Sequence, residues 1–247
     1  MKKSILMLSV AGLLIVASCK KDNKAVSENV CLITESTYKE PAKDPETSFY
    51  TYDAESRLTN VRYVQKNGYN HTKDYTYSDL EIIEEEKYSN STYVNKYTLD
   101  AMGRIVKETY PYSVVLYVYN LDGYLIEIKR SSSSYPLKTI SKYAYTDGNL
   151  TSVEFEDDYT VNFTYTNESA RDNFYSEIEF PNNNLLRGRY GKTSKNLVAV
   201  ATQIKKGVVA YSASYAYKKD AAGNVILATA IGSDGKTYAI NSTYNCK

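Results

Sequence analysis

A short pattern that recurs along the chain constrains its fold more than any other feature. Each copy has two residues, mostly tyrosines, spaced by two, then a turn rich in Asp, Asn or Gly, and then a run with apolar positions. The clearest copies are YTYDAESRLTNV from Tyr50, YTLDAMGRIVKE from Tyr97, YVYNLDGYLIEI from Tyr117, YAYTDGNLTSV from Tyr143 and YAYKKDAAGNVIL from Tyr215. Because side chains two apart lie on one face of a pleated strand, each copy predicts a β-hairpin.

The turn of each copy carries residues suited to a tight reversal. In DAMG, Asp100 can accept backbone N–H hydrogen bonds and Gly103 can take a positive φ, and NLDG repeats this with Asn120 and Gly123. The pattern predicts a type I turn that closes into a bulge. Ser56 replaces the glycine in the first copy, which predicts an irregular hairpin there. The remaining predicted turn residues are Asp147 and Gly148, in a two-residue type I′ turn, and Asp220 and Gly223.

The apolar residues after the turns are three apart, as in Leu58 and Val61 or in Leu150 and Val153. Strict alternation would place the two members of each pair on opposite faces of the strand. A bulge just past the turn would return both to one face and add twist to the sheet. We therefore predict an all-β fold in which consecutive antiparallel hairpin repeats form one strongly twisted, curved sheet or partial barrel.

The repeat breaks down at about residues 167–196, where we predict a short helical or irregular insertion. Asn167 or Ser169 could cap a short helix, and Pro181 would end the segment after Glu177. A sheet of this kind must cover its apolar face. We expect the apolar side chains of the insertion to pack on the inner face of the sheet, namely Phe174, Tyr175, Leu185 and Leu186.

The N-terminal residues indicate export. Lys2 and Lys3 precede an apolar run about half as long as the roughly 20 residues of a membrane-spanning helix. The sequence VASC ending at Cys19 resembles the lipobox of bacterial lipoproteins, in which the signal is cut before the cysteine and the thiol receives lipid. An ordinary cleaved signal with an incidental Cys19 is the alternative. We predict a signal peptide at 1–18, a flexible tether at 19–29 and a β-hairpin repeat domain at 30–247.

Two cysteines remain for the repeat domain, Cys31 near its start and Cys246 near its end. Exported proteins reside in compartments where disulfides can form. A bridge between the two would close a loop of about 215 residues, for which the chain-entropy model gives roughly 5 kcal/mol. We predict this disulfide, and two free thiols in a reducing niche are the alternative.

Charge excludes one class of partner. Removal of the signal peptide leaves 28 basic and 29 acidic residues. A near-neutral domain without a basic stripe lacks the electrostatic footprint of a nucleic-acid-binding protein. The expected partners are the membrane, through the N-terminal lipid, and a glycan or an envelope protein.

Few residues are suited to catalysis. The one histidine, His71, lies near a hairpin turn and is expected to be a solvated strand residue. Zinc-ligand spacing, a nucleophile elbow, a phosphate-binding loop and an EF-hand pattern are all missing from the sequence. We therefore predict no enzyme, no metal site and no cofactor.

Two acidic clusters leave a carboxylate-dependent glycoside hydrolase open, because such an enzyme needs only two suitably spaced acids. The first cluster is Glu81, Glu84, Glu85 and Glu86, and the second is Glu156, Asp157 and Asp158. We expect the first cluster to be a solvated strand edge, where charge blocks edge-to-edge pairing, and the second to be a turn.

The aromatic content points to strands and leaves a binding role open. The chain has 27 Tyr, five Phe and no Trp. Tyr is a strong strand former with a hydroxyl that tolerates a half-wet face, which accounts for most of these residues. An exposed row of Tyr rings could instead stack on sugars. A glycan-capturing accessory of a nutrient-uptake system is therefore an alternative function, although the sequence identifies no ligand-binding residue.

The repeats also resemble known families. The YxYDxxGRL copies look like the tyrosine-aspartate repeats of Rhs toxins and teneurins, which wind hairpins into a hollow shell. The whole chain is similar to a family of Bacteroidetes lipoproteins with a domain of unknown function. The matching features are the lipobox at Cys19, an early Cys31, the Tyr-Asp hairpins, the stretch GKTSKNL from Gly191 to Leu197, and a terminal Tyr-x-Cys at Cys246.

This resemblance implies a fold and a cellular location but no activity. Rhs shells need many more repeats than the roughly seven present here, so an open sheet or partial barrel is expected. We predict an exported protein that is lipid-anchored to the cell envelope, on either leaflet of the outer membrane, and acts as a non-catalytic binding or interaction module.

Overall fold

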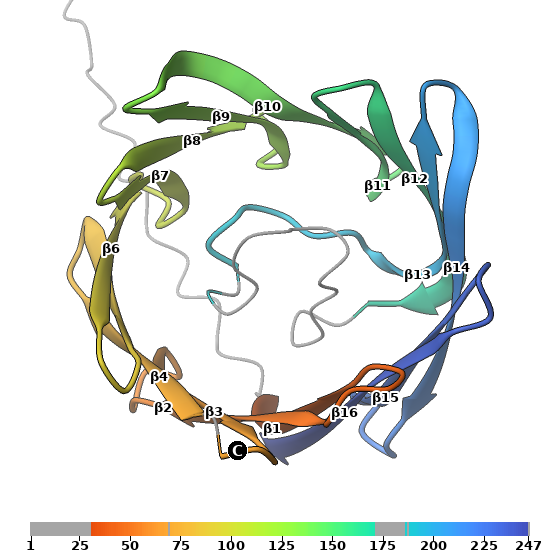
Figure 1. Ribbon diagram of the computed structural model, residues 1–247, viewed down its shortest axis with the longest axis horizontal. Helices are drawn as coiled ribbons and strands as arrows, with labels where there is room; N and C mark the ends of the chain where they lie inside the picture. Colours follow the sequence, from red (N-terminus) through yellow and green to blue (C-terminus); the bar gives the residue numbers. More distant parts are fainter. Residues whose placement is uncertain (1–30, 69, 171–185, 187, 247) are drawn as a thin grey trace, which may run out of the picture.

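Each strand of the chain pairs with its neighbours in sequence, and the last strand pairs with the first. The computed structural model describes residues 31–246 except 69, 171–185 and 187, and over these residues it is a closed antiparallel barrel of sixteen strands (Figure 1). The strands are β1 (Cys31–Lys39), β2 (Glu46–Tyr52), β3 (Leu58–Gln65), β4 (Asn70–Tyr77), β5 (Glu81–Lys87), β6 (Thr92–Leu99), β7 (Ile105–Tyr110), β8 (Ser113–Tyr119), β9 (Leu125–Ser132), β10 (Tyr135–Thr146), β11 (Asn149–Phe155), β12 (Tyr159–Ser169), β13 (Asn196–Lys205), β14 (Val208–Lys219), β15 (Val225–Gly232) and β16 (Thr237–Cys246).

The predicted all-β sheet of consecutive hairpins is confirmed, and it closes completely where a partial barrel was expected. Closure requires a sheet that curves continuously, and bulges supply this curvature by bending and twisting the strands that carry them. The seam lies between β1 and β16, which pair from Cys31 opposite Cys246 to Lys39 opposite Ala239. The predicted disulfide is present at the end of this seam, with an S–S distance of 2.02 Å between Cys31 and Cys246.

The alternation of side chains gives the barrel an apolar inner ring. Ile82, Tyr97, Ile105 and Leu125 face inward and are fully buried. Full burial of a large apolar side chain stabilises a fold by about 1.5–3 kcal/mol. The ring lies toward the end of the barrel that carries the connections β2–β3, β6–β7, β8–β9, β10–β11 and β14–β15, which we call the turn rim. The opposite end is the far rim.

Asp and Asn side chains organise the connections of the turn rim. Asp100 Oδ1 accepts hydrogen bonds from the backbone N–H groups of Met102 and Arg104, both at 2.9 Å. Asp147 and Gly148 both have positive φ, as a type I′ turn requires. Ser56 also has a positive φ, of 63°, which a non-glycine residue adopts at some cost. The other turns use Asn120, whose Oδ1 accepts from Tyr124, Asp220, whose Oδ1 accepts from Asn224, and the positive-φ glycines Gly103, Gly123 and Gly223.

A bulge follows the turn in most hairpins and is coupled to the tyrosines of the repeat. In β3 the extra residue lies between Leu58 and Asn60, so Leu58 and Val61 both face inward. Pairing of β3 with β4 ends at Asn60, which leaves the carbonyl of Leu58 beyond the ladder. The hydroxyl of Tyr77 on β4 donates to this carbonyl at 2.7 Å. The tyrosine therefore satisfies a backbone acceptor that the bulge removes from the ladder.

The same contact recurs around the barrel. In each case a tyrosine hydroxyl donates to the carbonyl of the residue that starts a bulge on the preceding strand. The further pairs are Tyr52 with Ile33, Tyr119 with Ile105, Tyr165 with Leu150, Tyr217 with Val198 and Tyr244 with Val225.

The hairpin of β5 and β6 shows that the bulge and the donating tyrosine occur together. β5 pairs with β4 and with β6 without any register shift. At the position where other hairpins carry the donating tyrosine, β6 ends in Leu99, and its backbone N–H donates to the carbonyl of Leu80 at 2.8 Å. A hairpin without the bulge thus has no carbonyl for a tyrosine to satisfy.

The segment before β13 runs along the inside of the turn rim. Its backbone meets three successive turns: Ile105 N–H donates to Arg189, Lys192 N–H to Gly123, and Lys195 N–H to Gly148, at 2.7, 2.9 and 3.0 Å. Gly191 makes this approach possible, because a Cβ there would lie 2.4 Å from the carbonyl oxygen of Gly123. The described residues from Gly188 to Lys195, which overlap the start of the GKTSKNL stretch, therefore form a strap that joins the turns from inside.

The predicted insertion at 167–196 is only partly described. Residues 167–169 continue β12, and the described residues from Gly188 to Lys195 are irregular and contain no helix. Leu186 is buried in the apolar core, as expected for this segment. Phe174, Tyr175 and Leu185 lie outside the described residues, as do the predicted signal peptide, the tether and Cys19.

Candidate functional site: the inward face of the barrel

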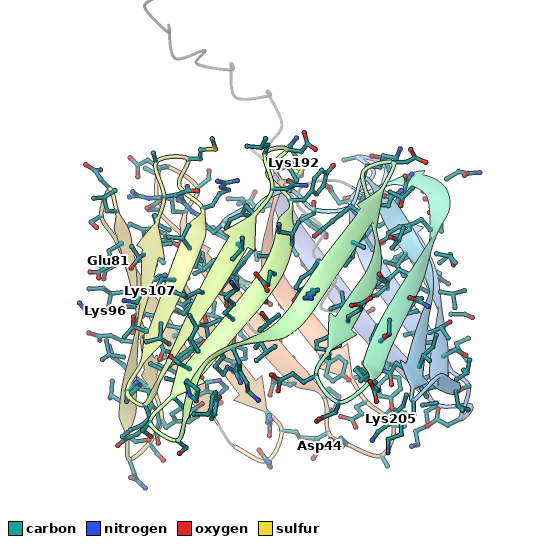
Figure 2. The ribbon with its side chains drawn as sticks, turned by 90° about the horizontal axis from the view of Figure 1, so that it is seen from above. Asp44, Glu81, Lys96, Lys107, Lys192 and Lys205 are labelled. Carbon is teal, nitrogen blue, oxygen red and sulfur yellow. A yellow bond between two sulfur atoms is a disulfide. The ribbon has the colours of Figure 1, made fainter. Side chains whose placement is uncertain are left out.

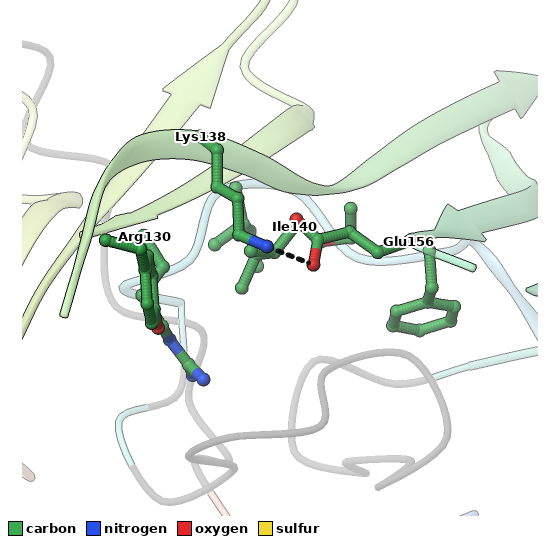
Figure 3. A pocket seen from close by; sticks show the side chains of 8 residues that line it. Arg130, Lys138, Ile140 and Glu156 are labelled. Atoms are coloured by element: carbon green, nitrogen blue, oxygen red, sulfur yellow. Dashed lines mark hydrogen bonds and ion pairs between the residues drawn. The ribbon is translucent and has the colours of Figure 1, made fainter. Parts of the chain in front are cut away.

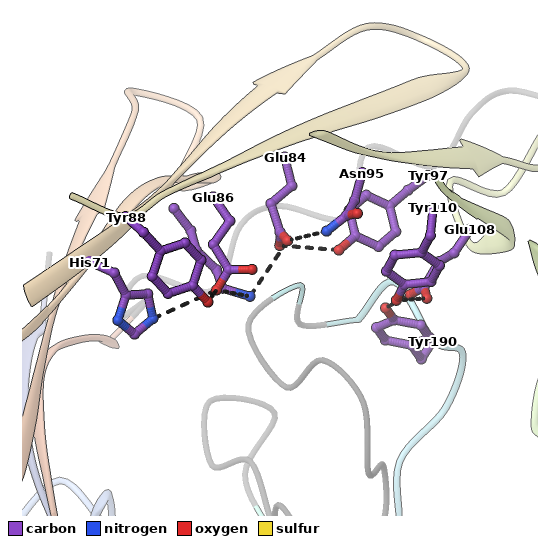
Figure 4. Close-up of polar contacts among 10 residues, drawn as sticks. His71, Glu84, Glu86, Tyr88, Asn95, Tyr97, Glu108, Tyr110 and Tyr190 are labelled. Atoms are coloured by element: carbon purple, nitrogen blue, oxygen red, sulfur yellow. Dashed lines mark hydrogen bonds and ion pairs between the residues drawn. The ribbon is translucent and has the colours of Figure 1, made fainter. Parts of the chain in front are cut away.

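Charged side chains gather on the inward face of β4–β7, below the apolar ring. They face one another in three cross-strand pairs: Lys73 with Glu86, Glu84 with Asn95, and Tyr97 with Glu108. Cross-strand neighbours on one face are close enough for their side chains to interact. The register of the sheet therefore brings acids, a cation and a tyrosine from four strands into one cluster, which we call the polar wall (Figure 4).

The prediction of a solvated strand edge at residues 81–86 is wrong. β5 is paired on both sides, and Glu84 on it is fully buried. Glu86 also faces inward, whereas Glu81 and Glu85 face outward. The two-residue period of the strand separates the four acids into an inner and an outer pair. The second acidic cluster, from Glu156 to Asp158, forms the turn between β11 and β12.

Glu84 has a donor for each carboxylate oxygen. Asn95 Nδ2 donates to Oε1 at 2.9 Å, and the hydroxyl of Tyr97 donates to Oε2 at 3.1 Å. Lys73 Nζ lies 3.5 Å from Oε1 and an equal 3.5 Å from Glu86, so one cation serves two acids. Buried charge is tolerated only when it is paired and hydrogen-bonded, and Glu84 meets both conditions.

Glu108 is held by tyrosines instead of a cation. The hydroxyls of Tyr110 and Tyr190 donate to its carboxylate at 2.5 and 2.6 Å. Burial raises the pKa of Glu108 above its ordinary range, and the hydrogen bonds from Tyr110, Tyr190 and Tyr117 oppose this shift. Tyr190 comes from the strap, so this contact ties the strap to the polar wall.

His71 is not the solvated residue that the sequence suggested. Its ring stacks on Tyr63 at 4.1 Å between centroids and on Tyr88 at 5.1 Å. Its Nε2 lies 3.7 Å from Glu86. Burial lowers the pKa of His71, against the opposing effect of Glu86. The antiparallel register of β3 and β4 creates this stack by placing Tyr63 across from His71, and the sequence alone does not specify that register.

A pocket of about 510 Å³ lies further around the inner wall, where β9, β10 and β11 meet (Figure 3). β10 shifts register twice against β9, and the bend that results opens the space. Lys138 and Glu156 form an ion pair of 2.8 Å at the pocket, while Arg130 extends beside it from β9. Sequence reasoning missed Arg130; the available signal was its position two residues after the inward-facing Ile128.

The outer face has a different character. Ion pairs lie on it at β4–β6 and β9, including Lys87 with Asp74 at 2.9 Å and Lys96 with Glu81 at 3.5 Å. Figure 2 shows Glu81, Lys96 and Lys107 pointing away from the wall. On β12–β16 the outward positions are mostly uncharged, with polar residues such as Thr160, Asn162, Thr202, Ser214, Thr229 and Asn241.

The described residues were also searched for metal-binding groups and for membrane-spanning helices. Within the described part of the chain, His, Cys, Asp and Glu side chains form no group of three or more that could hold a metal ion. In the described ranges we also find no helix with the length and apolar composition needed to cross a membrane.

Comparison with known proteins bears on the fold. The sequence matches no family model, and no curated protein matches it either. Among solved structures, a porin-like protein from Bacteroides uniformis ATCC 8492 is 18% identical, with a TM-score of 0.69 over 86% of this chain and 98% of that chain. This likeness supports the barrel fold.

Two other solved structures are less similar. A porin-like protein from Bacteroides vulgatus ATCC 8482 is 11% identical, with a TM-score of 0.40 over 87% of this chain and 99% of that one. The Photorhabdus luminescens Tc holotoxin pore is 15% identical, with a TM-score of 0.31 over 82% of this chain and 10% of that one. TM-scores this low do not establish a shared fold.

Proposed function

We propose that this chain is an exported, lipid-anchored protein of the cell envelope that acts as a non-catalytic binding module through the inward face of its barrel. The lipid would be carried by Cys19, and the tether at 19–29 would join it to the barrel. The likeness to a Bacteroides protein fits the resemblance to Bacteroidetes lipoproteins with tyrosine-aspartate hairpin repeats.

The polarity of the wall carries this proposal. Transmembrane β-barrels expose an apolar band about 25 Å tall to lipid. Here the outward positions of β4–β6 and β9 hold ion pairs, and those of β12–β16 mix Thr, Ser and Asn with apolar residues such as Val200, Ile204 and Leu227, so polar residues interrupt any apolar band. A wall of this kind is suited to water, so a barrel that belongs to the envelope would need a separate attachment, and lipid on Cys19 supplies one.

The concave inner face supports a binding role. Ligand sites are concave and combine an apolar lining with a few placed polar groups. The pocket between β9 and β11 has this composition, with Ile128, Ile140 and Phe155 beside Arg130 and Lys138. Among the described residues, tyrosines of the repeat such as Tyr77 and Tyr217 donate their hydroxyls to backbone carbonyls, so these hydroxyls are engaged within the barrel.

The buried acids favour binding over hydrolysis. A glycosidase needs two carboxyl groups that reach the substrate. Glu84 and Glu108 are both fully buried, and each is engaged by donors from neighbouring strands. These acids are placed to stabilise the wall and offer no open face to a substrate.

The anchor can be tested directly. The full chain is produced in a Gram-negative host and labelled with radioactive palmitate, beside Cys19→Ala and the tether variant Ser27→Ala as a matched control. We expect wild type and Ser27→Ala to carry label and to sediment with membranes, and Cys19→Ala to do neither. If Cys19→Ala remained in membranes with its signal peptide removed, as N-terminal sequencing would show, the barrel itself would be the membrane-associated part and the proposal would fail.

The binding role has its own test. Ile140→Trp would fill the inner pocket, and Val114→Trp would place the same side chain on the outer face of β8. A panel of sugars, amino acids and organic acids is titrated into the full chain and followed by ligand-observed NMR. We expect at least one class to bind wild type and Val114→Trp saturably but not Ile140→Trp.

A further inference from the structure

Arg130 is a cation of the inner wall, and one donor of its guanidinium is buried. Its Nε is buried, and among the described residues no group accepts a hydrogen bond from it. A guanidinium keeps its charge at any pH a protein meets. A buried charged donor that lacks an acceptor is costly, so an acceptor from outside the chain would stabilise this site.

The neighbouring charges are already paired. Lys138 Nζ lies 2.8 Å from Glu156 and 5.2 Å from the centre of the Tyr135 ring. The pocket therefore has a net positive charge that comes from Arg130.

The rest of the pocket is suited to an apolar body. Ile128 is almost fully buried at the base, and Ile140 and Phe155 complete an apolar lining. The hydroxyl of Ser141, also buried, adds one polar group beside them. Lys138 and Glu156 are the more exposed members and mark the mouth. A volume of about 510 Å³ is within the range of small-molecule sites.

We infer that this pocket binds a small organic carboxylate with an apolar ring or chain, whose carboxylate meets the guanidinium of Arg130 and whose apolar body lies against Ile128, Ile140 and Phe155. A carboxylate can accept two parallel hydrogen bonds from a guanidinium, which a spherical cation cannot supply. The inference rests on the proposed binding function and names the ligand class of that same inner face.

The probe is phenylacetate, titrated calorimetrically into the full chain in detergent against blank micelles. Phenylacetamide has the same shape without the charge, and inorganic phosphate has charge without the apolar body. We expect saturable one-to-one binding of phenylacetate, with both comparison compounds at least about tenfold weaker.

The variants locate the site. Arg130→Met should weaken phenylacetate at least about tenfold, and Arg130→Lys should fall between it and wild type, because the charge remains while the fork is lost. Lys129→Met is the matched control, since Lys129 is the adjacent residue of β9 but faces outward, 3.2 Å from Glu127. It should bind as wild type does, and thermal unfolding of each variant checks that the barrel is intact.

Each contrary outcome is distinct. Equal binding of phosphate would reduce the site to a simple anion site, and equal binding of phenylacetamide would reduce it to an apolar pocket; either overturns the inference. Unchanged binding by a folded Arg130→Met does the same. If no carboxylate binds, but another class of ligand binds wild type and loses binding in Ile140→Trp, the inference is wrong and the proposed function stands. If no class of ligand loses binding in Ile140→Trp, both are wrong.

Discussion

The inner face of the barrel has two walls of opposite chemistry. On β4–β7 the inward positions include Lys73, Glu84 and Glu108, and on β13–β15 the inward positions include Ala201, Ala213 and Gly232. We call the second set the small wall. Each wall contains a hairpin with the bulge and the turn glycine, β6–β7 with Gly103 and β14–β15 with Gly223.

The comparison separates what builds the barrel from what gives its interior a chemistry. The bulge, the tyrosine and the turn lie near the turn rim and recur in both walls. The charged or small residues lie further along the strands and differ between them. The repeat therefore determines the fold, while the inward residues beyond it can differ in charge and size without changing the fold.

Moving a charge from the polar wall to the small wall should have the largest effect. Ala213→Glu places an acid between Ala201 and Gly232, neither of which can pair with it. An unpaired buried charge costs about 3–5 kcal/mol, in addition to about 1–3 kcal/mol for overpacking at this buried position. Urea unfolding at pH 8 measures the loss. Ala213→Gln carries the volume without the charge and should lose only the smaller part. Equal losses would mean that the small wall tolerates charge as the polar wall does.

Removing the cation of the polar wall should cost nearly as much. Lys73→Met leaves Glu84 and Glu86 without their shared partner, and breaking a buried pair costs about 3–5 kcal/mol. Lys96→Met is the outer-face control, because an exposed ion pair contributes about 1 kcal/mol or less. Similar urea midpoints for the two variants would contradict the view that the polar wall is a buried network.

The tyrosines of the two walls allow a finer comparison. Tyr97→Phe removes a donor to the Glu84 carboxylate, and hydrogen bonds to charged groups contribute about 1.5–3 kcal/mol. Tyr217→Phe removes a donor to the Val198 carbonyl, for which about 0.5–1.5 kcal/mol is expected. The order of the two losses in chemical denaturation is the test, and a reversed order would show that the carbonyl contacts dominate.

The smallest expected effect is a change in how steeply the free energy of unfolding depends on pH. Burial raises the folded-state pKa of Glu108 above its ordinary 4.5, so the folded state holds this proton more tightly than the unfolded chain does. The contribution of Glu108 to stability is then present below about pH 4.5 and declines as the pH rises through its raised pKa. Glu108→Gln cannot titrate, so the variant should lose less stability than wild type as the pH rises from 4.5. An unchanged slope would assign the pH dependence to other groups.

The fold could be predicted because its signals are local. The spacing of Leu58 and Val61 specifies a bulge within a few residues of the turn, and a glycine such as Gly103 specifies a positive φ at one position. Complete closure depends on β1 meeting β16 across the whole chain, and no short pattern reports that pairing.

The polar wall could not be predicted for a related reason. Ile82 and Ile83 are both apolar, so the sequence does not decide which of them faces inward. The strand register places Ile82 opposite Tyr77 and Tyr97 on the inner face, and Glu84 and Glu86 then also face inward. Likewise, His71 stacks on Tyr63 because the register of β3 and β4 places the two residues opposite each other, and no short pattern reports that register.

The bond from each tyrosine to the bulge before it has a kinetic consequence. Each hairpin can dock on its predecessor through residues that are close in sequence, so assembly can advance step by step without waiting for distant partners. Only the joint between the first and last strands spans the whole chain, and we expect it to form last. Pulse-labelled hydrogen exchange during refolding should show amides at that joint gaining protection after those of β7 and β8, and early protection there would refute the sequence of events.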